Sequence, residues 1–184
     1  MSRGFVLPSQ ISPPIAAAGG LVLVTAQTGF TAQNNITSDG VFTSAYTNYK
    51  IILNYSTSTT NSVVLRLRVG GVSAATNYNR VFLEGLGSTT SVGTSAGGTS
   101  MLIAPNTNGV LATAVIELHR PAEAVPTMIT ALNNLPVGAN YATPAIWIFG
   151  NNHSTAAAYD GIELLVPTGT MTGTYTIYGY GKTS

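Results

Sequence analysis

Short apolar runs recur along the chain after Gly20, and polar residues and turn formers separate them. Runs rich in Val, Ile, Leu, Thr and Tyr that are bounded by Gly, Asn, Ser or Pro are typical of β-strands. The pattern predicts strands at 21–25, 41–42, 49–55, 63–69, 78–84, 110–118, 127–132, 145–149, 161–166 and 174–180. The polar segment 56–61 separates two of these runs, 49–55 and 63–69, which we expect to form a hairpin.

No part of the chain shows a sustained helical pattern. No window of eleven or more residues keeps the 3.6-residue period with good helix formers, and the alanine clusters at 16–18 and 156–158 are too short to form helices alone. We find no repeat of fixed length, which argues against propellers and solenoids. The sequence therefore predicts an all-β fold, a two-sheet antiparallel β-sandwich of jelly-roll-like type, over residues 21–184.

Residues 1–20 differ from the rest of the chain because they contain three prolines and end in the pair Gly19–Gly20. This composition resists helices and strand interiors, so we expect an extended N-terminal arm, with a frayed terminus as the alternative. A fully extended arm would reach about 65 Å at about 3.3 Å per residue, enough to cross a neighbouring subunit. The arm residues expected to dock on a partner are Phe5, Val6, Leu7, Pro8, Pro13, Pro14 and Ile15.

The chain is unusually poor in charge. Only 7% of its residues are Asp, Glu, Lys or Arg, and the formal net charge is +1, whereas about 25% are charged in an average soluble protein. Such a polar but nearly uncharged surface suits a chain that is locked into an assembly with copies of itself. The basic residues are scattered, and Arg66 and Arg68 share one strand face that we expect to be solvated or ion-paired. We therefore expect no nucleic-acid partner.

Nothing in the sequence indicates a crosslinked, secreted or membrane-inserted chain. There is no cysteine, so disulfides and thiol chemistry are excluded. The apolar run 21–24 is too short and begins too late for a signal peptide, which we do not expect. Every uninterrupted apolar run is far shorter than the 18 or more residues that a membrane helix needs, so we expect no membrane insertion.

Residues 87–100 form a low-complexity Gly/Ser/Thr segment that we expect to be an exposed loop, or a loop that only a partner orders. The segment contains GTSAG, which matches the G-x-S-x-G nucleophile motif with Ser95. Glu117 or Glu123, followed by His153, would complete the order of a catalytic triad. That motif needs a preceding strand and a following helix, and neither is expected here. We therefore predict that the chain is not an enzyme.

Metal and cofactor sites are not expected either. His119 and His153 lie far apart in the sequence, and neither has a second ligand at a common metal-site spacing. Glu117 shares a strand face with His119, and we expect a hydrogen-bonded surface pair there. The Gly85–Gly87 segment lacks the third glycine of a dinucleotide fingerprint. We predict no cofactor.

Aromatic residues offer a better candidate for a contact surface. The chain has nine tyrosines and one tryptophan, and these flat amphipathic rings suit contacts with glycans or proteins. Tyrosines on strands more often pack the core, so we place the contact surface in the polar loops. The residues expected to touch a receptor or partner are Tyr141, Trp147, Asn151, Asn152, His153 and Tyr159.

Two segments resemble a known family. Residues 41–71, VFTSAYTNYKIILNYSTSTTNSVVLRLRVGG, resemble bacteriophage tail-fibre and minor tail proteins, in which a "vF…YxnYxi" strand precedes a polar turn and an "LRLR" strand. Residues 161–182, GIELLVPTGTMTGTYTIYGYGK, resemble the closing hairpin of those proteins, in which a "tGT" turn leads into an "iYGY" strand. Together the two segments cover about 50 residues.

The resemblance implies a phage virion protein with a jelly-roll-like sandwich, commonly a homotrimer, at the virion surface. As a tail-fibre module, the chain would dock on tail or baseplate proteins through its arm and hold host surface glycans through its loops. Small jelly-roll proteins also serve as capsid cement or decoration proteins, and the arm would then lie across subunits of the major capsid protein. This alternative stays open because no repetitive shaft precedes the sandwich. A tailspike-like polysaccharide hydrolase is a third, less favoured hypothesis.

Overall fold

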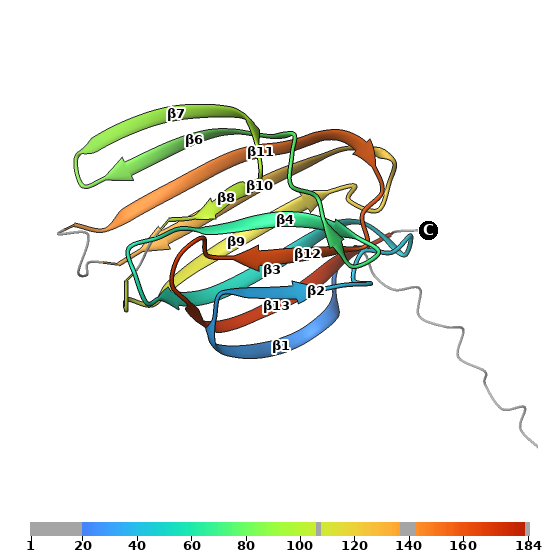
Figure 1. The fold of residues 1–184 in the computed structure, drawn as a ribbon, viewed down its shortest axis with the longest axis horizontal. Helices are drawn as coiled ribbons and strands as arrows, with labels where there is room; N and C mark the ends of the chain where they lie inside the picture. The colour runs from blue at the N-terminus through green and yellow to red at the C-terminus, as the bar shows by residue number, and fades with distance from the viewer. Residues whose placement is uncertain (1–19, 106–107, 137–142, 183–184) are drawn as a thin grey trace, which may run out of the picture.

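In a computed structural model of the chain, the described residues are 20–105, 108–136 and 143–182. They form thirteen β-strands and no helix, so none of them belongs to a helix that could span a membrane. The strands make two antiparallel sheets that pack face to face (Figure 1). The fold is therefore the two-sheet antiparallel β-sandwich that the sequence pattern predicts.

The larger sheet has eight strands in the order β1-β13-β3-β9-β10-β11-β6-β7. The strands are β1 (Leu21–Gln33), β13 (Met171–Gly181), β3 (Tyr46–Thr57), β9 (Ala112–His119), β10 (Val125–Leu135), β11 (Ala145–Ala157), β6 (Tyr78–Leu86) and β7 (Thr89–Gly98). The smaller sheet has five strands and runs β2-β12-β4-β5, with β8 also paired to β4. These strands are β2 (Asn35–Ser38), β12 (Gly161–Leu165), β4 (Val63–Val69), β5 (Val72–Ser73) and β8 (Met101–Ala104).

The core lies between the two sheets. Along β3 every second residue is buried, and Ile51 and Leu53 are fully enclosed. Leu65 and Leu67 of β4 are enclosed in the same hydrophobic cluster. Because successive side chains of a strand point to opposite faces, this alternation leaves the other face of β3 pointing away from the smaller sheet.

The structure corrects both predicted hairpins. β3 belongs to the larger sheet and β4 to the smaller one, so the segment between them crosses the sandwich. β12 and β13 are likewise in different sheets, because β12 pairs with β2 and β4 whereas β13 pairs with β1 and β3. The apolar faces of each pair meet across the core instead of lying side by side in one sheet.

The structure also corrects the loop predicted at 87–100, because most of this low-complexity segment forms the strand β7. β7 pairs along β6 and is the last strand of the larger sheet. Its small residues bury little apolar surface, so backbone hydrogen bonds to β6 hold it in place. The predicted strand at 41–42 is wrong, because Val41 and Phe42 are buried in a loop, where the Phe42 N–H donates to the Asp160 carbonyl.

Two strands that come from the segments 41–71 and 161–182, β3 and β13, lie side by side in the fold. β3 and β13 pair antiparallel over most of their length. Gly179 of β13 leaves room for the ring of Tyr46, because a Cβ at this position would lie 2.3 Å from the Tyr46 Cγ atom. The glycine of the "iYGY" run and the first tyrosine of the "YxnYxi" run therefore fit together as one packing unit.

Candidate functional site

The side of the larger sheet that points away from the smaller sheet, here called the outer face, carries a continuous apolar row. The row follows the strand register from β7 to β3, and its members are Val92, Leu83, Ile148, Leu132, Val115 and Ile52. Val92 is 76% exposed and Ile148 is 46% exposed. Further exposed apolar side chains flank the row, namely Val81, Met128 and Ile146. A monomer rarely exposes a contiguous apolar surface of this kind.

The charged side chains Lys50 and Glu117 of the outer face form an ion pair with each other. The Lys50 ammonium lies 3.1 Å from the Glu117 carboxylate, and the Tyr180 hydroxyl donates to the same carboxylate at 2.6 Å. Burial, together with the Glu117 charge, raises the pKa of Tyr180 to about 12. The partners of Glu117 are thus Lys50 and Tyr180, and not His119 as the sequence pattern predicts.

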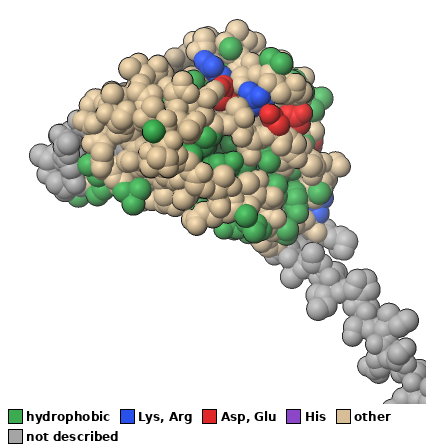
Figure 2. Space-filling view, turned by 60° about the horizontal axis from the view of Figure 1, so that its bottom comes forward, with side chains coloured by type: hydrophobic (Ala, Val, Ile, Leu, Met, Phe, Trp, Pro, Cys, Tyr) green, Lys and Arg blue, Asp and Glu red, His purple; other side chains and the backbone are tan. Residues whose placement is uncertain are grey.

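The outer surface of the smaller sheet is different, because two arginines and their carboxylate partners lie on it. Arg68 binds Asp39 through two hydrogen bonds of 2.7 and 3.2 Å, and this contact lowers the pKa of Asp39 below its ordinary value. Arg66 lies 3.5 Å from Glu163 on the neighbouring strand. In Figure 2 most of the visible charged side chains lie close together in the upper right part of the view, and most of the remaining surface in that view is uncharged. The expectation of an ion-paired face at Arg66 and Arg68 is confirmed.

A second candidate surface lies on the inner side of β6, β7 and β11, where these strands extend past the smaller sheet (Figure 1). The rings of Phe82 and Trp147 are 5.2 Å apart, and Trp147 stacks on Phe149 at 5.8 Å with an angle of 10°. Phe82 and Trp147 are only partly buried. The Phe82 ring lies over Gly93, where a Cβ would come within 2.4 Å of it. The patch is therefore a partly exposed aromatic platform.

Polar side chains border this platform at both ends. Arg80, Phe82 and Glu84 point to the same side because they alternate along β6. The Arg80 guanidinium lies 5.6 Å from the Phe82 ring centroid. At the other end the Ser91 hydroxyl donates to Glu84 at 2.7 Å. We call Arg80, Phe82, Glu84, Ser91 and Trp147 the aromatic patch.

Arg80 has an exceptional environment. The other described arginines, Arg66, Arg68 and Arg120, each form an ion pair with a carboxylate. Arg80 forms none with any described residue, and its Nε atom is buried without a hydrogen-bond partner. Arg80, Phe82 and Glu84 are spaced two residues apart, which is the sequence signal that places them on one side of a strand. The same spacing occurs in every strand, so it does not single out these three residues.

The structure separates the residues that the sequence placed on one contact surface. Trp147 belongs to the aromatic patch, and Asn152 is partly buried on the outer face, where its amide oxygen accepts from Asn79 at 2.8 Å. Asn151, His153 and Tyr159 are 2%, 2% and 5% exposed, so for them the prediction is wrong. Residues 151–153 continue the strand β11 instead of forming a loop tip.

Tyr141 and the arm residues lie outside the described part of the chain. This holds for all seven arm residues from Phe5 to Ile15 that we expect to dock, and only Gly20 of the segment 1–20 is described. Their roles stay predictions.

The buried His153 forms a small polar network in the core. The Tyr159 hydroxyl lies 2.9 Å from its Nδ1 atom, and the Tyr78 ring packs at 4.5 Å. Burial lowers the pKa of His153 below its ordinary value. The folded protein therefore keeps this imidazole neutral at a pH where the unfolded chain binds a proton.

We expect the free energy of unfolding to fall as the pH drops below about 6.5, the value of an unperturbed histidine. His153→Gln should remove the part of this stability loss that comes from His153, because glutamine does not titrate. Urea denaturation between about pH 7.5 and 5.5 measures the effect. His119→Gln, which changes an exposed histidine, is the control and should leave the loss in place. An unchanged pH dependence in His153→Gln would contradict the assignment.

The triad suggested by the GTSAG motif does not assemble. Ser95 lies within β7 opposite Arg80, and the following strand β8 takes the place of the helix that the motif needs. His153 is enclosed in the core with Tyr159. Among the described residues, no group of three His, Cys, Asp or Glu side chains could hold a metal ion.

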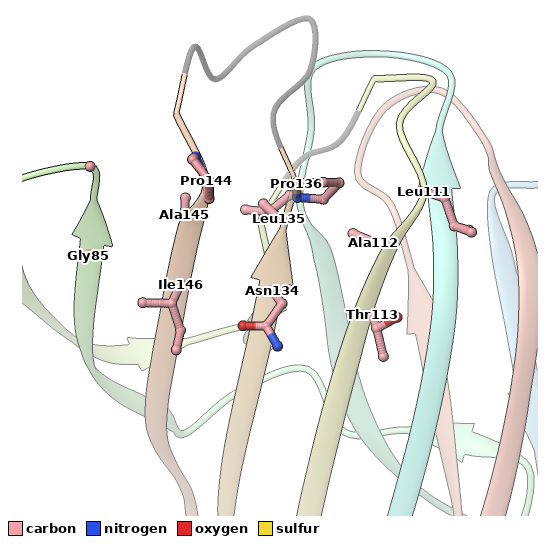
Figure 3. Close-up of a pocket in the computed structure, with 11 residues that line it drawn as sticks. Gly85, Leu111, Ala112, Thr113, Asn134, Leu135, Pro136, Pro144, Ala145 and Ile146 are labelled. Atoms are coloured by element: carbon pink, nitrogen blue, oxygen red, sulfur yellow. The ribbon is translucent and has the colours of Figure 1, made fainter.

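An open hollow lies at the ends of β9, β10 and β11 (Figure 3). Its lining is largely apolar and includes Leu135, Pro136, Pro144 and Ile146. Asn134 and Thr113 are the polar side chains that line it. These groups offer little chemistry, so we assign no function to the hollow.

Comparisons with known proteins leave the family open. No family model matches the chain, and no curated protein matches it. Among solved structures, the chain is similar to the galectin LEC-6 of Caenorhabditis elegans, with a TM-score of 0.37 and 12% sequence identity. The match covers 84% of this chain and 96% of the galectin.

Proposed function

We propose that this chain is a structural protein of a bacteriophage virion, a self-assembling and trimeric adhesion module of the tail fibre. The observation that carries the proposal is the apolar row across six strands of the outer face. The row would be a liability on a free monomer with a net charge of +1. It would be the centre of an interface in an assembly.

The occupant that fits the outer face best is a second copy of this chain. The face spans eight strands, which is about 34 Å at about 4.8 Å between strands, and seven residues along a strand span about 23 Å. The resulting flat area of roughly 780 Å² agrees with the roughly 800 Å² that each partner buries in a standard interface. In a trimer the three outer faces would turn towards one common axis, where sheet faces can pack at about 10 Å with interdigitating side chains.

The electrostatics of the outer face also favour a copy of the chain over a charged partner. Lys50 and Glu117 neutralise each other within one chain, so they need no partner of opposite charge. A second copy brings the same neutral, apolar surface. Charge depletion at the centre is typical of protein interfaces.

The virion assignment is supported by the two segments that resemble phage tail proteins. They pair as β3 and β13, and they share the contact between Tyr46 and Gly179. Because the two segments pair in the structure, their similarities concern one packed unit of the fold. Two similarities in unrelated parts of the fold would be weaker support. Within this proposal the chain sits at the virion surface, its arm docks on tail or baseplate proteins, and it performs no catalysis.

Immunogold labelling of purified virions with an antibody against this domain tests the location. We expect label at the tail. Label spread over the head would instead assign the chain to the capsid as a cement protein. Virions that carry no label would overturn the virion assignment altogether.

A further inference from the structure

We propose that the aromatic patch is a binding site for a short acidic oligosaccharide. This inference names the ligand class of the adhesion module and rests on the proposed function.

The rings supply the apolar part of the site. Phe82 and Trp147 come from neighbouring strands, and their centroids lie 5.2 Å apart. Both remain partly exposed, although enclosed aromatic rings are common elsewhere in this core. A sugar ring has an apolar face of C–H groups that can stack on such a platform, and aromatic rings contribute contact area at low entropic cost.

Arg80 supplies the site for the acidic group. Among the described arginines, Arg80 is the one whose guanidinium has no carboxylate partner. Its Nε–H group is buried and has no hydrogen-bond acceptor. The Nε atom itself is enclosed, so a ligand carboxylate would pair with the partly exposed remainder of the Arg80 side chain through charge-assisted contacts. The Phe82 ring beneath the guanidinium holds it in place.

Glu84 and Ser91 supply polar groups at the other end of the platform. Glu84 lies four residues from Arg80 on the same side of β6, which is about 13 Å at about 3.3 Å per residue. The carboxylate can accept hydrogen bonds from sugar hydroxyls, and its contact with Ser91 fixes its orientation. The patch thus joins a cation, an apolar platform and an acceptor in a row that suits a chain of sugars with an acidic end.

The location of the patch is compatible with assembly. It lies on the inner side of β6 and β11, whereas the apolar row lies on the outer face of the same strands. Burial of the outer face between copies therefore leaves the patch open. Each copy contributes one weak site, and several sites in one assembly raise the avidity.

Trp147 is the single tryptophan of the chain, so its fluorescence reports on this site alone. We would screen the full chain against an array of acidic bacterial oligosaccharides and their carboxyl-reduced counterparts, and then titrate the hits by fluorescence. We expect acidic members to bind and to change the Trp147 emission. Arg80→Gln should weaken this binding by about tenfold or more and should leave weak binding of the reduced sugars unchanged.

Arg120→Gln is the matched control, because Arg120 is an exposed arginine paired with Glu123 away from the patch. It should bind the acidic sugars like the parent chain. The proposal is overturned if no acidic oligosaccharide is preferred over its reduced form, or if Arg80→Gln and Arg120→Gln behave alike. Virions labelled at the tail combined with no sugar binding would refute the site but not the tail function. Sugar binding without virion label would do the reverse.

Discussion

Ile148→Glu should convert the assembled protein into monomers. Ile148 lies in the apolar row between Leu83 and Leu132. In the proposed assembly this substitution places an unpaired carboxylate in an apolar interface, where desolvation costs about 3 kcal/mol or more and raises the dissociation constant about a hundredfold. Light scattering coupled to size-exclusion chromatography measures the change, and we expect the mass of a single chain instead of a multiple of it.

Val72→Glu is the control for this experiment. Val72 is also an exposed apolar residue, at 68% exposure, but it lies on β5 in the smaller sheet. The variant should keep the mass of the parent assembly. Because Ile148 is 46% exposed in the isolated chain, the folding stability of Ile148→Glu should change by only about 1 kcal/mol or less. A parent chain that is already monomeric, or an Ile148→Glu assembly of unchanged mass, would contradict the proposed interface.

Gly173→Ala should destabilise the sandwich severely. Gly173 lies in β13 against β3, and a Cβ at this position would come within 2.0 Å of the Asn54 carbonyl oxygen and 2.9 Å of the Tyr55 Cα atom. These are backbone atoms of a paired strand, so they cannot turn aside as a flexible side chain could. We expect a loss of about 3 kcal/mol in the free energy of unfolding. Chemical denaturation monitored by Trp147 fluorescence measures the loss.

Gly29→Ala separates this steric effect from a general effect of glycine replacement. Gly29 lies in β1, pairs with the neighbouring residue Thr174 of β13, and has no atom within 4 Å of an added Cβ. Its replacement should change stability by about 0.5 kcal/mol or less. Equal effects at the two glycines would show that close packing of β13 on β3 is not the cause.

The pairing of β13 with β3 also shows why part of the fold was predictable. The alternation along 49–55 predicts a strand with one buried face, and β3 buries Tyr49, Ile51, Leu53 and Tyr55 as expected. The same alternation does not identify the partner, because a neighbour in the same sheet and a facing strand across the core produce the same pattern. The predicted hairpin of 49–55 with 63–69 was wrong for this reason.

The prediction of a loop at 87–100, where the structure has β7, was wrong for a different reason. Thr89–Gly98 has almost no large apolar side chains, so hydrophobic periodicity gives no signal for it. Pairing with β6 orders the segment through the backbone, which every sequence possesses. The close fit of Phe82 over Gly93 becomes visible only once the two strands are in register.

The candidate site residues also differ in whether the sequence alone gave a signal for them. Trp147 was predicted to be a contact residue because it is a rare, large amphipathic side chain. Arg80 and Phe82 were missed, because an arginine and a phenylalanine two residues apart on a strand are ordinary. Asn151 and His153 were misplaced, because polar residues in sequence resemble a loop, whereas hydrogen bonds to Leu102 and Tyr159 allow them to be buried.

The sequence by itself determined the all-β class, the alternation that builds the core and the scarcity of charge that favours assembly. These properties depend on local periodicity and composition, which do not require a partner strand. Only the tertiary structure decided which strands pair, which alternate face is left uncovered and that Arg80 lies beside Phe82 without a carboxylate. Strand pairing and the uncovered face depend on strand order and register, which contacts between residues distant in the sequence decide. The missing carboxylate beside Arg80 depends on which side chains β7 and β11 bring next to β6.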